Sequence, residues 1–164
     1  MRGLLTIGYE GASLQDFIET LKAASVTTLL DVRELPISRR KGFSKRALAE
    51  ALEAEGIEYR HERDLGSPKA IRHQLHEDRD YDQFFDAFTT YLKSQRPLLR
   101  KLAAELDGRV ALMCFERDPA TCHRSIVAKQ LESLTQLKTR HLGVKDGIAG
   151  QRARAGAGEG VPAA

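Results

Sequence analysis

RVALMCFERDPATCHRS, residues 109–125, contains an apolar run, a polar loop and the start of a segment with helical spacing. The apolar run is typical of a buried strand that ends at Cys114, and apolar side chains recur at helical intervals from Ile126 to Leu134. The two cysteines of the chain, Cys114 and Cys122, lie at either end of the loop. A strand that leads through a loop into a helix is one unit of an α/β fold, so this stretch predicts that fold class.

The same alternation of strand and helix extends over the rest of the chain. Further strands are predicted at 4–9, 27–32 and 57–61, with an edge strand at 139–142. Helices are predicted after Ser13, after Ser44, over the aromatic stripe 84–92 as far as Pro97, over 98–106, and over about 121–134. Together these elements predict a single α/β domain, with a mostly parallel sheet of about five strands and helices on both faces.

Two segments fall outside this alternation. Residues 62–83 are polar and dense in charge, which predicts a loop with room for one helical turn. From Val144 onward the chain is rich in Gly, Ala and Arg and has no hydrophobic period. We therefore expect the α/β domain to comprise residues 1–143 and residues 144–164 to form a disordered tail.

Composition excludes several classes of protein. The chain has 164 residues, of which 41% are hydrophobic and 30% charged, as is typical of a soluble globular domain. Its net charge of +3 is too small to predict nucleic-acid binding by itself. No apolar run approaches the roughly 20 residues of a membrane span, and the N-terminal residues lack a signal-peptide pattern. We expect a cytoplasmic protein with no membrane partner and with free thiols.

Reactive residue types collect where the predicted strands end. Parallel strands bring their carboxyl ends to one edge of the sheet, and α/β proteins place their sites there. The residues expected at this edge are Tyr9, Glu10, Asp31, Arg33, Cys114 and Glu116. Asp31 would orient a base or, more simply, hold an arginine. Glu10 would serve as a general base or as a carboxylate at a helix N-terminus.

Three consecutive residues after the polar loop are the strongest catalytic candidates. Cys122 is expected in the first turn of a helix, where the helix dipole favours a thiolate, and His123 lies beside it. Arg124 is a cation in a first turn, which is unfavourable for the helix and typical of a functional site, unless it pairs with Asp31 or Glu116. Cys114 is either a second reactive thiol or a buried residue that packs as a small hydrophobe.

An arginine-rich pocket for an anion is the expected binding site. Arg39, in the densest basic stretch of the chain, follows the second strand and should lie near Arg33 and Arg124. Guanidinium groups match phosphate and sulfate oxygens, and Tyr9 and Phe43 are placed to stack on a base. A small anionic or nucleotide-like ligand is therefore the expected partner, and nucleic acid remains open.

Metal binding is the less favoured interpretation of the same residues. Cys114, Cys122 and His123 with a carboxylate would supply zinc ligands, but their spacing matches no standard zinc motif. Because Cys122 and His123 are adjacent, both side chains are not expected to reach one ion easily. No metal and no cofactor are therefore expected.

Several blocks of the sequence resemble the signature of the domain-of-unknown-function 488 family, over about residues 4–142. In chain order, the blocks are Thr6 to Gly11, Asp31 to Arg33 with Pro36 and Ser38-Arg39, Leu65-Gly66, Cys114 to Glu116, and Cys122 to Arg124. The resemblance implies an α/β domain, and it implies no particular reaction. A weaker similarity to rhodaneses and cysteine phosphatases rests on Cys114 and Arg124, but nine residues separate them, more than in the anion-binding loops of those enzymes.

These observations predict an enzyme, a hydrolase or a transferase, that acts on a phosphate-, sulfur- or nucleotide-bearing substrate. The alternative is a non-catalytic nucleic-acid-binding or regulatory module. Steep salt dependence of binding would mark a polyanion binder, whereas an enzyme would show turnover that depends on Cys122 or Cys114. The sequence does not determine the oligomeric state.

Overall fold

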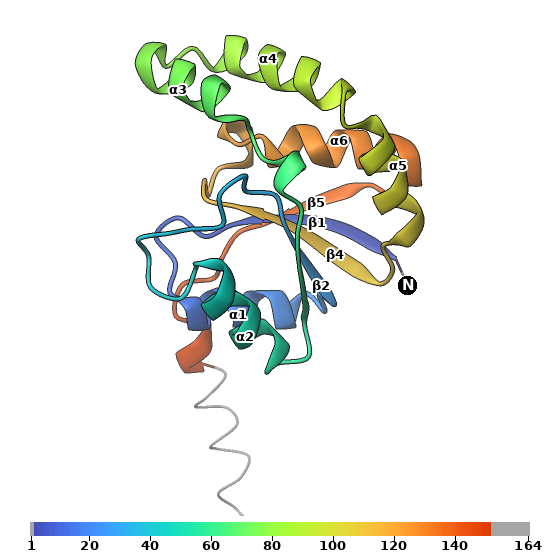
Figure 1. Cartoon of the computed structure of the whole chain (residues 1–164). Helices are drawn as coiled ribbons and strands as arrows, with labels where there is room; N and C mark the ends of the chain where they lie inside the picture. The colour runs from blue at the N-terminus through green and yellow to red at the C-terminus, as the bar shows by residue number, and fades with distance from the viewer. Residues whose placement is uncertain (1, 152–164) are drawn as a thin grey trace, which may run out of the picture.

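The computed structural model of the protein describes residues 2–151 and contains a five-stranded, all-parallel sheet (Figure 1). The strands are β1 Gly3–Gly8, β2 Thr28–Asp31, β3 Glu58–His61, β4 Arg109–Cys114 and β5 Thr139–Leu142. Their order in the sheet is β3-β2-β4-β1-β5. The predicted α/β fold, the number of strands and the edge position of β5 are confirmed.

Helices cover both faces of the sheet, as predicted. They are α1 Leu14–Ala23, α2 Lys45–Glu53, α3 Lys69–Asp78, α4 Tyr81–Lys93, α5 Arg96–Glu105 and α6 Arg124–Thr135, with short 3₁₀ helices at Arg63–Leu65 and Pro119–Thr121. In Figure 1, α1 and α2 lie on one face, and α4, α5 and α6 lie on the other. No helix in the described part of the chain is long and apolar enough to cross a membrane.

Each face of the sheet has its own hydrophobic core. Strand side chains alternate in direction, so Leu5 and Ile7 of β1 face α1 and α2, whereas Leu4 faces the opposite helices. The first core includes Phe17, Leu21, Leu29, Phe43, Leu48 and Leu52. The second core includes Leu30, Phe88, Leu92, Leu99, Leu102, Leu112, Val127 and Leu131.

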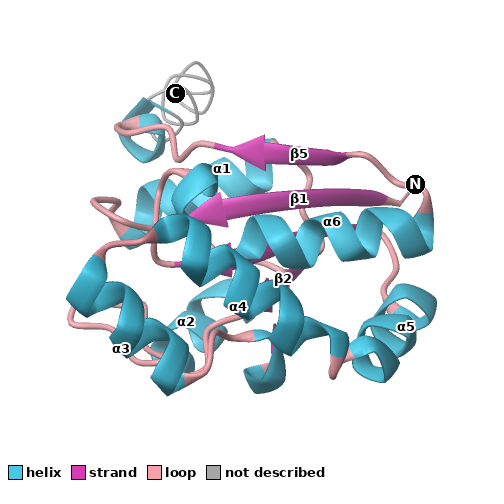
Figure 2. Cartoon of the chain, turned by 90° about the horizontal axis from the view of Figure 1, so that it is seen from above, coloured by secondary structure: helices cyan, strands magenta, loops and turns pink. Residues whose placement is uncertain are grey.

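The predicted loop over residues 62–83 is wrong in its main feature, because it contains the ten-residue helix α3. The hydrophobic pattern of this segment is weak, and α3 has no buried residue. The helix lies against α4 at one end of the molecule (Figure 2). Tertiary packing of this kind often stabilises a helix that local pattern does not reveal.

The folded part of the chain extends past residue 143, where the sequence predicts the domain to end. Val144 and Ile148 are buried. The Asp16 carboxylate of α1 accepts hydrogen bonds from the backbone N–H groups of Gly147, at 2.9 Å, and Ala149, at 3.0 Å. Residues 144–151 therefore pack on the domain, and the rest of the predicted tail, 152–164, lies outside the described residues.

Candidate functional site

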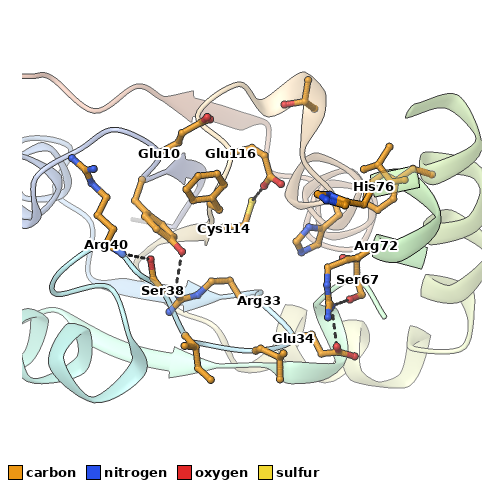
Figure 3. A pocket seen from close by; sticks show the side chains of 18 of the residues that line it. Glu10, Arg33, Glu34, Ser38, Arg40, Ser67, Arg72, His76, Cys114 and Glu116 are labelled. Carbon is orange, nitrogen blue, oxygen red and sulfur yellow. Dashed lines mark hydrogen bonds and ion pairs between the residues drawn. The ribbon is translucent and has the colours of Figure 1, made fainter. Parts of the chain in front are cut away.

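A cleft of about 1060 Å³ opens beyond the carboxyl ends of the strands (Figure 3). Strands β1 and β4 are neighbours in the sheet, but the chain leaves β1 towards β2 and leaves β4 towards β5. Such a reversal of direction creates the crevice in which α/β proteins usually bind ligands. The residues after these two strands, Tyr9 to Gly11 and Cys114 to Glu116, line the cleft.

The structure brings most of the predicted site residues to this cleft. Its lining includes Tyr9, Glu10, Arg33, Arg39, Cys114, Glu116 and His123. Asp31, Cys122 and Arg124 are buried close to the same sheet edge but do not line the cleft. The residues predicted to form a site therefore lie at or near one cleft, and the structure changes what several of them contact.

Asp31 and Arg33 form a buried ion pair. Arg33 Nε donates to Asp31 Oδ1 at 2.9 Å and Arg33 Nη2 donates to Asp31 Oδ2 at 2.7 Å. Arg33 Nη1 donates to the Tyr9 hydroxyl and to the Phe43 carbonyl oxygen. These bonds occupy the guanidinium, so the expected role of Arg33 and Asp31 as substrate ligands is corrected to a structural one.

The aromatic surface of the cleft differs from the one expected. Tyr9 and Phe43 stack on each other in the core, with ring centroids 4.5 Å apart, so neither presents a free face to a base. Phe115 is the exposed ring, with 45% of its surface accessible, and it packs nearly perpendicular to the Tyr9 ring, with centroids 5.4 Å apart. Alternation along β4 could have identified Phe115, because Cys114 points inward and the next side chain must point outward.

Basic residues surround the cleft on two sides. Arg39 and Arg40 follow β2, and Arg72, His76 and Arg79 belong to α3 or its end. In Figure 3, Ser38 and Arg40 lie on one side of the cleft, and Arg72 and His76 lie on the other. The second group was not expected from the sequence, because the pattern of residues 62–83 predicts a loop where α3 forms.

The two cysteines are joined as a disulfide, which corrects the expectation of free thiols. Both are buried, with only 1% of each exposed. Helix α6 begins at Arg124, so Cys122 precedes the helix and does not lie in its first turn. The expected activation of a Cys122 thiolate by the helix dipole is therefore also corrected.

His123 is held in one orientation at the base of the cleft. Its Nε2 donates to the Val32 carbonyl oxygen at 2.7 Å, and its ring packs edge-on against Phe88. Burial lowers the pKa of His123 to about 4, so the ring is neutral at neutral pH. A neutral imidazole that donates through Nε2 keeps the lone pair of Nδ1 free to accept a proton or a metal ion.

Arg124 lies under the loop and does not reach the cleft. It is completely buried, and its guanidinium donates to the carbonyl oxygens of Glu116 and Arg117 and contacts Cys114 Sγ at 3.3 Å. Burial lowers the pKa of Arg124 to about 10, because desolvation disfavours the charged form. The expected convergence of Arg33, Arg39 and Arg124 on one anion is thus corrected: Arg124 fixes the backbone of the cysteine loop.

Gly8 allows this loop to approach the end of β1. A Cβ atom at Gly8 would lie only 1.8 Å from the backbone oxygen of Glu116, so no larger residue fits there. The N–H of Tyr9 donates to the carbonyl oxygen of Cys114, and the N–H of Glu10 donates to that of Phe115. The β1–β4 ladder thus continues into the site and holds it rigidly.

Two carboxyl groups complete the base of the cleft. Glu10 is exposed and accepts a hydrogen bond from the N–H of Arg117 at 3.1 Å. Glu116 is partly buried, and its Oε2 lies 3.3 Å from Cys114 Sγ. Burial raises the pKa of Glu116 above its ordinary value. The two groups offer proton transfer at the cleft surface, and Glu116 also lies beside a possible set of metal ligands: Cys114, Cys122 and His123.

Comparison with known proteins supports the resemblance seen in the sequence. The family model described as Domain of unknown function DUF488 matches residues 13–131, which is most of the described chain and includes both cysteines. No curated protein and no solved structure matches the chain. On the extent of the family match, the chain belongs to the domain of unknown function 488 family.

Proposed function

We propose that the protein is an enzyme whose cleft binds a phosphate-bearing, nucleotide-like substrate. The observation that carries the proposal is a pair of exposed arginines on a cleft that also has an exposed aromatic ring. Among residues 2–151, neither the Arg39 nor the Arg79 guanidinium has a hydrogen-bond or ion-pair partner; only the backbone N–H of Arg79 is bound, to the Leu75 carbonyl oxygen. Free guanidinium groups are suited to phosphate oxygens, and Phe115 offers a face to a planar base.

The charge of the cleft supports an anionic ligand. Its lining contains five arginines and three glutamates. Arg33 is bound to Asp31, and Arg72 pairs with Glu34 at 2.9 Å. Arg40 donates to the carbonyl oxygen of Ala12. Arg39 and Arg79 are the arginines left for a ligand. Because they come from different segments of the cleft wall, each offers a guanidinium to a phosphate-bearing ligand.

The chemistry that this site supports is hydrolysis or transfer at the bound group. Glu10 presents a carboxylate to the cleft next to Phe115, at the junction of β1 and β4. A carboxylate in this position is suited to act as a general base towards water or a hydroxyl nucleophile. The buried, disulfide-linked cysteines are not available as nucleophiles in this state, so Glu10 replaces Cys122 as the proposed catalytic group.

Calorimetry with three probes tests the proposal: a nucleoside 5′-monophosphate, the corresponding nucleoside, and inorganic phosphate. We expect the nucleotide to bind more tightly than either of its parts, because it contacts both the ring and the arginines. Arg39→Ala and Arg79→Ala should each weaken nucleotide binding by about 10-fold or more, as expected for the loss of a charge-assisted contact. Arg46→Ala, an exposed arginine of α2, is the matched control. Equal affinity in all three variants would contradict the proposal.

The alternative function is a nucleic-acid-binding or regulatory module. The combination of a basic rim and an exposed aromatic ring is also used to bind single strands. A polynucleotide would bind with affinity that increases with length and falls steeply with salt. Turnover of a small phosphate ester that is abolished by Glu10→Gln would favour the enzyme, whereas length-dependent binding without turnover would favour the module.

A further inference from the structure

Three metal-ligating side chains meet at the base of the cleft. The ligand atoms of Cys114, Cys122 and His123 all lie within 4.8 Å of one another, and all three side chains are buried. Two sulfurs and one imidazole nitrogen form a ligand set that zinc prefers.

The orientation of His123 is the first argument for a metal ion. Its Nε2 donates to the Val32 carbonyl oxygen at 2.7 Å, which leaves the lone pair of Nδ1 free to bind an ion. Nδ1 lies 3.9 Å from Cys122 Sγ. Metal-bound histidines characteristically donate through one ring nitrogen to a backbone carbonyl or carboxylate and bind the ion through the other. The adjacency of Cys122 and His123 in the sequence therefore does not prevent both from facing one point.

The backbone separation of the cysteines is the second argument. The Cα atoms of Cys114 and Cys122 are 7.4 Å apart. Most disulfides form over Cα separations of about 4.4–6.8 Å. Two thiolates that each lie about 2.3 Å from one zinc ion require more space than two bonded sulfurs. The loop and strand thus hold the two cysteines at a spacing suited to a shared ion.

Charge balance around the cluster is the third argument. Glu116 Oε2 lies 3.3 Å from Cys114 Sγ, close enough to complete a tetrahedral set. Arg124 Nη1 lies 3.3 Å from the same sulfur. The charge of Zn²⁺ would be neutralised by two thiolates, and the charge of the Glu116 carboxylate by the Arg124 guanidinium. A buried site without net charge avoids most of the cost of desolvation.

We propose that the reduced protein binds one zinc ion through Cys114, Cys122 and His123, with Glu116 as the fourth ligand. The disulfide and the zinc site are alternative states of the same cysteines. A dithiol reductant gives two electrons and two protons to the disulfide and is itself oxidised to a disulfide. The two resulting thiols release their protons when Zn²⁺ binds. The site lies at the base of the cleft and goes beyond the proposed function, because it does not depend on a nucleotide.

The experiment uses the full-length protein. The protein is reduced with a phosphine, incubated with zinc chloride and freed of excess metal by gel filtration. The zinc content per chain is then measured by elemental mass spectrometry. We expect about one zinc ion per chain, as for other sites with a complete tetrahedral ligand set. Cobalt(II) in place of zinc should give the visible bands of tetrahedral coordination together with thiolate charge-transfer absorption.

Variants locate the bound ion. Cys122→Ser and Cys114→Ser should each lose the bound zinc and the charge-transfer absorption, and Glu116→Gln should lose part of the zinc on gel filtration. His76→Gln, which changes a cleft histidine outside the cluster, is the matched control and should keep the full amount. If the reduced wild-type protein holds no zinc, or if the cysteine variants retain it, the proposal is wrong.

A second measurement is independent of the folding of the variants. Reduced wild-type protein is alkylated with iodoacetamide in the presence and absence of zinc, and each cysteine peptide is quantified. Zinc should protect both Cys114 and Cys122, since a metal-bound thiolate reacts slowly. Equal alkylation with and without zinc would overturn the proposal. Neither result bears on nucleotide binding, which is tested separately by calorimetry on the Arg39→Ala and Arg79→Ala variants.

Discussion

Arg33 holds the Asp31 carboxylate through two parallel hydrogen bonds, although the two residues are separated by a single position in the chain. Asp31 is completely buried and Arg33 is 7% exposed. Burial alone would lower the pKa of Arg33, but the bonds and the charge of Asp31 raise it above its ordinary value. The Tyr59 hydroxyl also donates to Asp31 at 2.6 Å. The pair is therefore a fixed, charged support for the end of β2.

We expect Arg33→Met to lower the free energy of unfolding by about 3–5 kcal/mol, because it leaves the Asp31 carboxylate buried without its cation. Urea denaturation of the full-length protein measures this change. Arg46→Ala, which breaks an exposed pair with Glu50, should change stability by less than about 0.5 kcal/mol. If Arg33→Met lowered the free energy of unfolding as little as the control does, the ion pair of Asp31 and Arg33 would not stabilise the fold.

Gly8→Ala should destabilise the protein by at least about 2 kcal/mol, because the new methyl group would overlap the backbone oxygen of Glu116. The matched control is Gly143→Ala, where the added Cβ has no atom within 4 Å. Thermal unfolding should show a clear decrease in midpoint for the first variant and little change for the second. Similar midpoints for both variants would mean that the loop does not approach β1 as described.

Phe115→Ala should weaken binding of a nucleoside 5′-monophosphate by about 5- to 100-fold, since stacking on an aromatic ring contributes about 1–3 kcal/mol per base. Because 45% of the ring is already exposed, the change should have little effect on folding. Phe115→Tyr should retain the affinity. Calorimetry on the three proteins checks the prediction, and unchanged affinity in Phe115→Ala would exclude this ring as a base platform.

The contact between Asp16 and the C-terminal segment should depend on pH. Backbone hydrogen bonds from Gly147 and Ala149 lower the pKa of Asp16 below its ordinary value. A lowered folded-state pKa means that the stabilisation is present above the unfolded pKa of about 3.9. The stabilisation is lost as the pH falls through the lower folded value. The amide NMR signals of Gly147 and Ala149 should follow this titration.

At neutral pH, Asp16→Ala should increase hydrogen exchange over residues 144–151, because it removes both acceptors. Asp82→Ala, which removes an exposed carboxylate of α4, is the control and should leave the exchange of this segment unchanged. Undiminished protection in Asp16→Ala would show that burial of Val144 and Ile148 alone holds the segment in place.

The sequence by itself determined the parallel α/β architecture and the edge of the sheet at which the candidate site residues gather. Apolar strands of period two and helical stripes such as Phe84 to Leu92 are local patterns, and local patterns are readable without a structure. The polar residues at the ends of β1, β2 and β4 had to meet, because parallel strands share one carboxyl edge. The start of a helix after Ser13 was also predicted from a local pattern. The Ser13 Oγ caps this helix by accepting a hydrogen bond from the N–H of Asp16.

Only the tertiary structure decided which of those residues line the cleft and which of them have polar groups without a partner. Arg33 and Arg124 were expected to bind an anion, but buried acceptors nearby take up their hydrogen bonds. Helix α3 has no buried side chain, so its sequence lacks the periodic apolar residues from which a helix is predicted. The arginines that α3 places at the cleft were missed for the same reason. Cys122 and His123 face one point because the loop turns before α6 begins. Hydrogen-bond partners, loop paths and the packing of a polar helix depend on contacts between residues that are distant in the sequence. The local pattern of the sequence does not specify those contacts.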